Sequence, residues 1–222
     1  MRELRLIAIY RFGAKGFLSD QAAEGPDQSV EEEHNMTSLP PWRPLLRAAR
    51  QREGRSPSAR WLQLATVAGD GTPRVRTLVF RGWVEGASLD LLTDGRSSKA
   101  AQLKQQPEVE LCWLLPKARC QFRLRGQLVA LPEAFEAQER QRHWQQLTPQ
   151  GRALWGWPHP GDPLDPQANF PATLEASLPM VQHFQLLRIS LHHVERLLLH
   201  GHPHRRSRWR ASCEWQEEPL NP

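Results

Sequence analysis

The sequence is poor in cysteine, in long apolar runs and in lysine. Its three cysteines, Cys112, Cys120 and Cys213, are too few and too scattered for a disulfide framework or a zinc ribbon. No apolar stretch approaches the about 18 residues of a membrane-spanning helix, and the apolar patch at 4–12 is too short for a signal peptide. These absences argue against disulfide-rich secreted proteins and membrane-spanning proteins, and we expect a reducing, cytoplasmic compartment.

Arginine is what the sequence has in excess. Of its 29 basic residues 25 are arginine and four are lysine, and the net charge is +5 over 222 residues. The hydrophobic content of 39% is enough for a core, and the mean hydropathy of −0.61 is that of a soluble chain. Guanidinium groups suit phosphate and carboxylate. Nucleic acid, a phosphorylated small molecule and a GC-rich coding bias are therefore all open explanations.

The first 36 residues differ from the rest in charge. They carry −3, which leaves +8 for the remainder, and their composition cannot bury much surface. We expect a disordered N-terminal extension over 1–36 and one folded domain over 37–222. Met36 opens a segment that resembles a natural start, so either translation begins there or 1–36 is an ordinary tail.

Frequent turn signals and alternating apolar residues predict a mainly β fold. The connections between most strands are too short for crossover helices, which favours a small, mainly antiparallel, Greek-key-like barrel with flanking helices. The predicted strands are 60–68, 74–84, 89–93, 109–115, 121–131, 184–190 and 207–215, and the predicted helices are 42–51, 97–106 and 132–147.

The segment 93–99 has the pattern of an anion site. A strand ends at Thr93, Gly95 supplies a turn, and a helix begins after Ser97 as a plausible N-cap. Arg96 and Lys99 lie in or beside its first turn, where cations oppose the helix dipole unless an anion joins them. The alternative is an ordinary capped helix with solvated basic residues.

The strand 74–84 adds a second cationic element. Arg74 and Arg76 share one face, and Arg81 falls on the other face unless a bulge re-aims it. The strand is otherwise apolar, so its arginines are expected to be partly buried, and a buried arginine needs a partner. Together the two segments predict a phosphate site.

Four short motifs resemble those of the pyridoxamine 5'-phosphate oxidases in order and spacing. They are 76–81 (RTLVFR), 92–93 (LT), 97–99 (SSK) and 120–126 (CQFRLRG). The strand and turn at 65–73, the loop 155–161 and the terminal segment 215–222 resemble the related FMN-binding branch that is common in cyanobacteria. The resemblance covers about 37–222.

This resemblance implies a split β-barrel that forms a homodimer, with FMN at the subunit interface. Arg76 and the backbone of 77–79 would contact FMN, and Thr93, Ser97 and Lys99 would hold its phosphate. Gln121 would reach the flavin across the dimer, and Arg81 stands where the family has a lysine. Carried over residue by residue, the expected FMN site comprises Arg76, Thr77, Leu78, Val79, Arg81, Thr93, Arg96, Ser97, Ser98, Lys99, Gln121 and Arg208.

The sequence departs from the family at several positions. Ser98 replaces an arginine of the phosphate motif, for which Arg96 is the expected substitute. His159 and Pro160 stand where the oxidases have Gln and Ser, and the substrate-binding Arg-x-His pair has no match. We therefore expect an FMN-dependent oxidoreductase of this type whose substrate, a small molecule, is open. A non-catalytic flavin carrier or redox sensor is the alternative, and nucleic-acid binding is more remote.

Most of the remaining histidine, cysteine and tryptophan residues are expected to have structural roles. The histidines at 200, 202 and 204 lack a further ligand of fixed geometry, so no metal site is expected. Cys120 has no adjacent base and is expected in the core. Trp61, Trp83 and Trp113 are also expected in the core, whereas Trp155, Trp157 and Trp209 lie where stacking on a flavin is conceivable.

Overall fold

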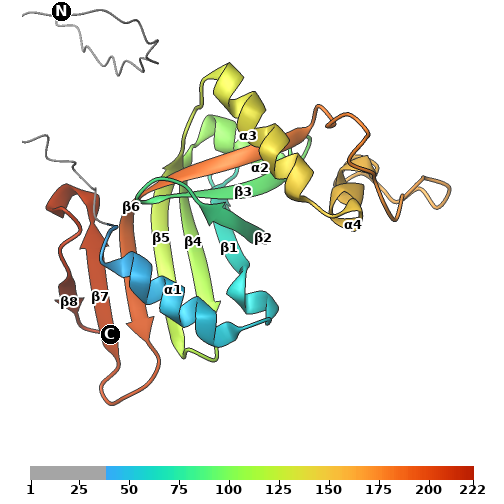
Figure 1. Ribbon diagram of the computed structural model, residues 1–222. Helices are drawn as coiled ribbons and strands as arrows, with labels where there is room; N and C mark the ends of the chain where they lie inside the picture. The colour runs from blue at the N-terminus through green and yellow to red at the C-terminus, as the bar shows by residue number, and fades with distance from the viewer. Residues whose placement is uncertain (1–38) are drawn as a thin grey trace, which may run out of the picture. The chain divides into compact units, whose positions relative to one another are not determined.

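Alternation of inward apolar and outward polar side chains builds one antiparallel sheet in the computed structural model, which describes residues 39–222 (Figure 1). Its strands are β1 (Trp61–Val67), β2 (Pro73–Trp83), β3 (Ser88–Asp94), β4 (Glu108–Leu115), β5 (Cys120–Leu128), β6 (Phe184–Leu198), β7 (Arg205–Arg210) and β8 (Glu218–Leu220). The expectations for 1–36 lie outside the described residues.

The first six strands close into a barrel in the order β3-β2-β1-β4-β5-β6, with β3 pairing back onto β6. The long strand β6 serves two neighbours on one edge. Its residues 184–190 pair with β3, and its residues 193–198 pair with β7. The barrel is split at this point, and the predicted split β-barrel with flanking helices is confirmed.

Four α-helices surround the barrel: α1 (Trp42–Glu53), α2 (Ser98–Gln105), α3 (Glu133–Gln146) and the short α4 (Pro149–Ala153). The helix α1 presents Trp42, Leu46 and Ala49 to the core at its helical spacing. Short 3-10 turns lie at Pro57–Ala59, Leu154–Gly156 and Ala211–Cys213. No helix in 39–222 is long and apolar enough to cross a membrane.

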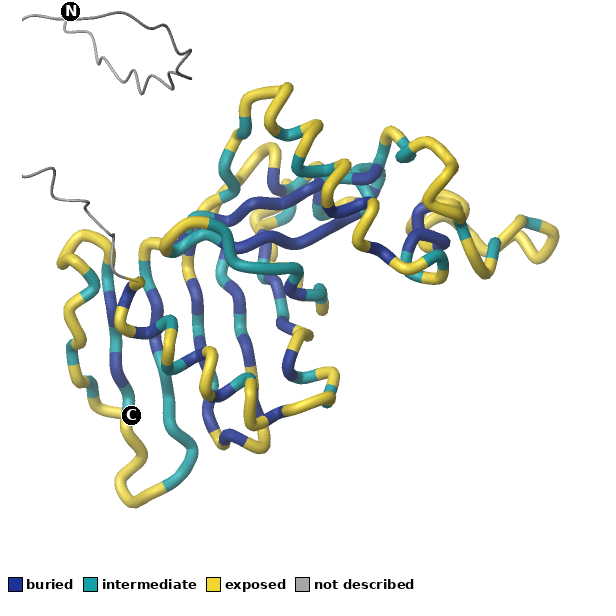
Figure 2. The backbone as a smooth tube through the Cα atoms, in the orientation of Figure 1, coloured by how far each residue is buried: buried dark blue, intermediate teal, exposed yellow. Residues whose placement is uncertain are grey.

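The apolar core has two parts, and Figure 2 shows where the chain is buried. The larger part fills the barrel and includes Trp113, as predicted, while Trp83 packs against its border. The smaller part joins α3 to the first half of β6 around Trp144. Trp61 was expected in the core but is 52% exposed, because β1 turns this side chain to the outside of the barrel beside Val79.

Two strand predictions were wrong in extent. Strand β6 continues to Leu198 rather than ending at 190, since pairing with β5 and β7 holds its polar second half in the sheet. Strand β7 ends at Arg210 instead of 215, because a 3-10 turn follows and Glu214 and Trp215 adopt φ values of 50° and 59°. The three-residue edge strand β8 was not predicted.

Candidate functional site

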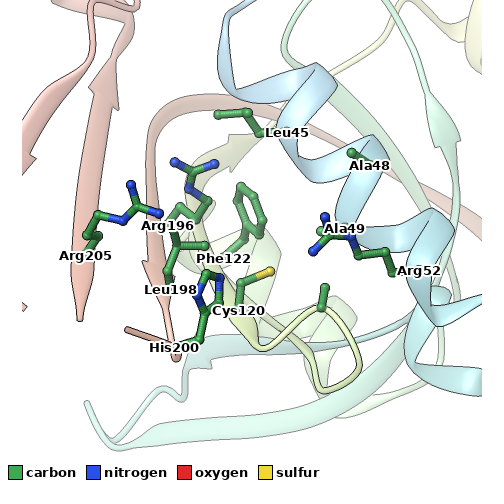
Figure 3. Close-up of a pocket in the computed structure, with 11 residues that line it drawn as sticks. Leu45, Ala48, Ala49, Arg52, Cys120, Phe122, Arg196, Leu198, His200 and Arg205 are labelled. Carbon is green, nitrogen blue, oxygen red and sulfur yellow. The ribbon is translucent and has the colours of Figure 1, made fainter. Parts of the chain in front are cut away.

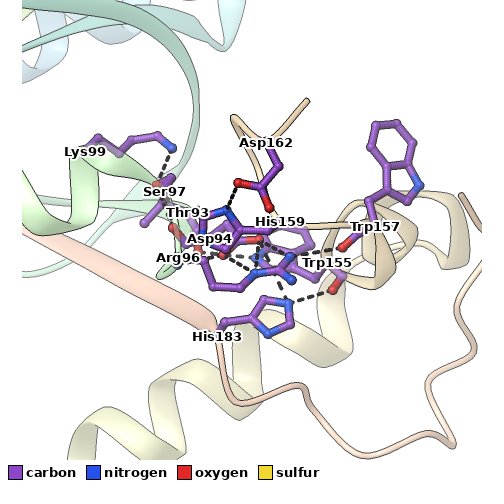
Figure 4. A network of polar contacts seen from close by, with 10 residues as sticks. All are labelled: Thr93, Asp94, Arg96, Ser97, Lys99, Trp155, Trp157, His159, Asp162 and His183. Atoms are coloured by element: carbon purple, nitrogen blue, oxygen red, sulfur yellow. Dashed lines mark hydrogen bonds and ion pairs between the residues drawn. The ribbon is translucent and has the colours of Figure 1, made fainter. Parts of the chain in front are cut away.

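The end of β3 and the start of α2 bring three predicted residues together (Figure 4). Lys99 Nζ donates to Ser97 Oγ at 2.8 Å, and Ser97 Oγ lies 3.5 Å from Thr93 Oγ1. Ser97 precedes the helix, but its hydroxyl donates to the Asp94 carbonyl at 2.6 Å and makes no capping bond to the helix amides. The start of α2 is thus left with donors suited to an anion.

Arg76 reaches the same helix from β2. Its guanidinium donates to Thr66 Oγ1 at 2.5 Å and to Gln102 Oε1 at 2.9 Å. Gln102 lies three residues after Lys99, on the same helix face. Sequence reasoning missed Thr66 and Gln102, although that spacing was a usable signal for Gln102.

The charges of Arg76 and Lys99 are not neutralised. Burial lowers the pKa of Lys99, and Arg76 lowers it further, while Asp94 acts in the opposite direction. Burial likewise lowers the pKa of Arg76, with Arg74 adding to the effect. Within 39–222 no carboxylate forms an ion pair with Arg76 or Lys99. Two partly buried cations without a counterion, beside hydroxyls and a helix start, suit a phosphate dianion.

Arg96 is engaged differently from what its sequence position predicts. Its guanidinium grips Asp94, with Nη2 2.6 Å from Oδ2 and Nε 3.0 Å from Oδ1, and it also donates to the carbonyl of Trp157 at 3.1 Å. The hydrogen bond with Asp94 raises the pKa of Arg96. In this conformation Arg96 ties the 155–161 loop to the end of β3, and its charge is already balanced.

Arg81 lies at an irregularity of β2, where the pairing with β3 shifts between Phe80 and Gly82. Its Nε is buried and has no hydrogen-bond partner among the described residues. Burial lowers the pKa of Arg81, and Arg60 lowers it further. A buried guanidinium beside a like charge and without an acceptor is a second place where an anionic or carbonyl-bearing ligand fits.

The side chains of the remaining predicted residues make no contact with this cluster among the hydrogen bonds of the described residues. Thr77 and Val79 point to the outside of β2, Leu78 packs against the core, and Ser98 is exposed. Gln121, on the outer face of β5, donates to Cys112 Sγ at 3.2 Å. Arg208 pairs with Glu218 at 2.7 Å, on the β7–β8 side of the barrel away from α2 (Figure 1).

The tryptophans considered for flavin stacking are mostly buried. Trp209 is fully buried in the barrel, so its ring is not available to a ligand. Trp155 packs in the smaller core, and its indole N–H donates to the carbonyl of Thr93 at 3.3 Å. Trp155 therefore stabilises the end of β3. Trp157 is 41% exposed and packs on Phe170.

A second polar cluster joins β3, β6 and α3. Asp90, Glu139 and His143 present ligand atoms within 4.8 Å of one another, a spacing compatible with a metal ion. The Arg188 guanidinium fills this position, because it bonds to Asp90 at 2.9 and 3.0 Å and to Glu139 at 2.5 Å. Arg142 also pairs with Glu139 at 2.9 Å and with Asp90 at 3.5 Å, so two arginines balance the two carboxylates.

The comparisons with known proteins show which family the chain belongs to. Residues 39–132 match the model of the pyridoxamine 5'-phosphate oxidase FMN-binding domain. The pyridoxine/pyridoxamine 5'-phosphate oxidase 2 of Arabidopsis thaliana is 31% identical over 169 residues, which are 73% of this chain and 85% of that protein. The chain belongs to the pyridoxamine 5'-phosphate oxidase-like family.

Two solved structures are similar to this protein in fold. A pyridoxamine 5'-phosphate oxidase-related, FMN-binding protein of Nostoc punctiforme is 38% identical, covers 83% of this chain and 100% of its own, and superposes with a TM-score of 0.76. PhzG from Burkholderia lata, solved in complex with tetrahydrophenazine-1-carboxylic acid, shares the fold at 23% identity and a TM-score of 0.66, covering 81% and 89%.

Proposed function

We propose that this family member is an FMN-binding flavoprotein whose phosphate site is formed by Arg76, Ser97 and Lys99. The observation that carries the proposal is the pair of partly buried, unneutralised cations at the start of α2. Thr66 and Gln102 orient Arg76, and Ser97 orients the Lys99 ammonium. The family match and the FMN-binding relative from Nostoc punctiforme support the same cofactor.

The proposed assembly is a homodimer with FMN between the two copies. The outward face of the barrel carries exposed apolar side chains, among them Val75 at 66%, Trp61 at 52% and Leu114 at 45% exposure. An apolar patch of this kind on a sheet face is typical of an interface. Gln121 lies on this same face, so a second copy packed there is the proposed route by which Gln121 reaches the flavin.

Bound FMN would supply hydride chemistry, and the protein would supply binding, orientation and electrostatics. Arg81 is the proposed source of positive potential beside the flavin, since its buried Nε has no acceptor of its own. Such a cation favours the anionic reduced form of the ring. Arg96 and Trp155 are proposed to hold the end of β3, on which the phosphate site is built.

The proposed activity is that of an oxidoreductase of the pyridoxamine-phosphate-oxidase type with an unassigned small-molecule substrate. One observation favours the alternative of a flavin carrier or redox sensor. Arg206, in the stretch where the oxidases have their substrate-binding pair, is held by Glu195 at 2.5 and 3.1 Å. The charge of its guanidinium is already balanced by Glu195, so Arg206 is not available to a substrate phosphate in this conformation.

One purification separates these functions. The full-length protein is expected to be yellow, or to become so with FMN, and to elute as a dimer. Pyridoxamine phosphate is then added in air and peroxide is followed. Peroxide supports an oxidase, whereas a yellow protein that forms none supports the carrier or sensor. A colourless preparation that FMN cannot reconstitute contradicts both.

The dimer has its own variant. Val75→Glu with Leu114→Glu changes exposed positions, so the monomer fold is expected to survive, while the dimer and FMN affinity both weaken. Glu133→Gln on α3, away from that face, is the control. An unchanged dimer in the double variant would rule out this face as the interface.

A further inference from the structure

A cavity of about 260 Å³ lies between α1 and the sheet, and its lining contains no residue of the proposed phosphate site (Figure 3). Its wall on the helix side is made by Leu45, Ala48 and Ala49, whose small or flexible side chains leave the space open. Its sheet side carries Cys120, Phe122 and Leu198. The cavity is therefore apolar over much of its lining.

The rim of this cavity is cationic. Arg196 and Arg205 enter it from β6 and β7, Arg52 from α1, and His200 from the hairpin between the two strands. The strand registers explain the arrangement, since Arg196 pairs with Phe122 and Arg205 pairs with Leu198, which places these side chains on one inner face.

Arg196 lacks the partners that a buried guanidinium needs. Its side chain is 18% exposed, and its Nε is buried with no hydrogen-bond partner among the described residues. Its other end lies 4.0 Å from Glu217 Oε1, and it stacks on the ring of Trp209 at 5.6 Å. An unpaired buried donor is costly, so an acceptor at this position would be strongly favoured.

No other carboxylate of the described residues competes for the cavity. Glu53 lies near Cys120, but its side chain accepts from the Ala118 amide at 3.0 Å and from the Ser58 hydroxyl at 2.9 Å. Burial raises the pKa of Cys120, so this thiol is neutral at pH 7. Among the described residues, Glu217 is the carboxylate that pairs with Arg196, through Nη2 at 4.0 Å, and no carboxylate side chain lines the cavity itself.

We propose that this cavity is a second ligand site, which binds a small amphipathic anion with one carboxylate or phosphate group on a single apolar ring. Arg196 is the main ligand of the charged group, and the lining around Phe122 receives the ring. A volume below the about 300–1,000 Å³ of pockets for drug-sized ligands limits the ligand to this size.

The site is separate from the proposed FMN site. On β7, Arg206 and Arg208 alternate with Arg205 and Ser207, so the residues aligned with flavin and substrate contacts point to the opposite face of the sheet. The residues of the cavity are therefore distinct from those of the proposed FMN site, and the proposal does not require that the flavin is turned over.

The test is calorimetric titration of the full-length, FMN-saturated protein with phenyl phosphate, benzoate, inorganic phosphate and phenol. Phenyl phosphate or benzoate is expected to bind once per chain, at least about tenfold more tightly than inorganic phosphate or phenol. Arg196→Met is expected to weaken this binding at least about tenfold, and Ala48→Phe, at an exposed helix position, to block it.

Two matched variants locate the binding. Arg47→Met, on the other side of α1, is expected to leave it unchanged, and so is Lys99→Met in the phosphate site. Binding that is lost in Lys99→Met would place the anion at the flavin site and overturn the proposal. Failure of both aromatic anions to bind, binding of inorganic phosphate with equal affinity, or full binding by both Arg196→Met and Ala48→Phe would also overturn it.

Discussion

Two clusters of cations in this molecule have opposite electrostatic states. Around Arg188, every charge is paired. Its guanidinium donates hydrogen bonds to both Asp90 and Glu139, and His143 Nε2 forms a hydrogen bond of 2.9 Å with Asp90 Oδ2. Around Arg76 and Lys99, hydroxyls and an amide oxygen are the partners, and no carboxylate pairs with either cation within 39–222.

The difference separates arginines that hold the fold from those available to a ligand. The hydrogen bonds that Arg188 donates to Asp90, acting against burial, raise the pKa of Arg188, so the folded protein favours its charged form. Burial lowers the pKa of Arg76, so folding disfavours that charge until an anion arrives. The arginine excess thus has two distinct uses, and variants can test the division.

The largest effect is expected from Arg188→Met. Removing one partner of a buried ion network leaves Asp90 buried with less compensation, which costs about 3–5 kcal/mol of unfolding free energy. Urea denaturation of the FMN-free protein measures it. The folded fraction should bind FMN with an affinity within about twofold of that of the unmodified protein. A decrease in unfolding free energy of less than about 1 kcal/mol would show that the network does not stabilise the fold.

Arg76→Ala should have the opposite profile. We expect FMN to bind about 10- to 100-fold more weakly, as for loss of a charge-assisted hydrogen bond. Flavin fluorescence titration gives the dissociation constants. His202→Ala, in an exposed hairpin, is the control and should not differ from the unmodified protein. Equal affinities for both variants would contradict the assignment of Arg76.

The paired network also predicts a dependence on pH. Burial alone would raise the pKa of Asp90, but hydrogen bonds from His143 and Arg188 outweigh it and hold the pKa below the ordinary 3.8. Since the folded pKa is lower than the unfolded one, ionised Asp90 stabilises the fold above about pH 4, and this stabilisation is lost as the pH falls through the folded value.

Acid titration tests this directly. The unfolding free energy of the unmodified protein should fall more steeply from pH 5 downward than that of Asp90→Asn, which has no carboxylate to protonate at this position. Parallel curves for the two proteins would mean that Asp90 does not contribute to the acid limb.

The smallest effect is expected for Lys99→Met without FMN. Burial and the nearby Arg76 disfavour the ammonium in the folded state, so its removal should leave stability unchanged or raise it by less than about 1 kcal/mol. A clear loss of stability in urea would show instead that Lys99 supports the fold.

Much of the barrel and part of the site could be predicted from the sequence. Alternation fixes the inner faces of β1, β4 and β5, and the strand end, turn and helix start at 93–99 mark the anion site. The hydrogen bond from Arg96 to the Trp157 carbonyl was not predictable, because the two residues lie far apart in the chain. Trp61 alternates with the buried Leu62 and Leu64, so its exposure could have been predicted from the pattern of β1.

The second half of β6 shows another limit of local patterns. The pairing with β5 shifts between Arg125 and Gly126, where β6 has one extra residue, His192. The polar residues His192 and His193 therefore interrupt the apolar alternation without ending the strand. The second half of β6 continues because β5 and β7 pair with it, and its own residue pattern does not predict this.

The assignment of Lys99 to the FMN phosphate is tested by comparing the binding of FMN with that of riboflavin, which lacks the phosphate. We would measure both dissociation constants in the unmodified protein, in Lys99→Met and in Lys104→Met, whose lysine lies exposed in the last turn of the same helix. We expect the preference for FMN to fall at least about tenfold in Lys99→Met and to be retained in Lys104→Met. An undiminished preference in Lys99→Met would contradict it.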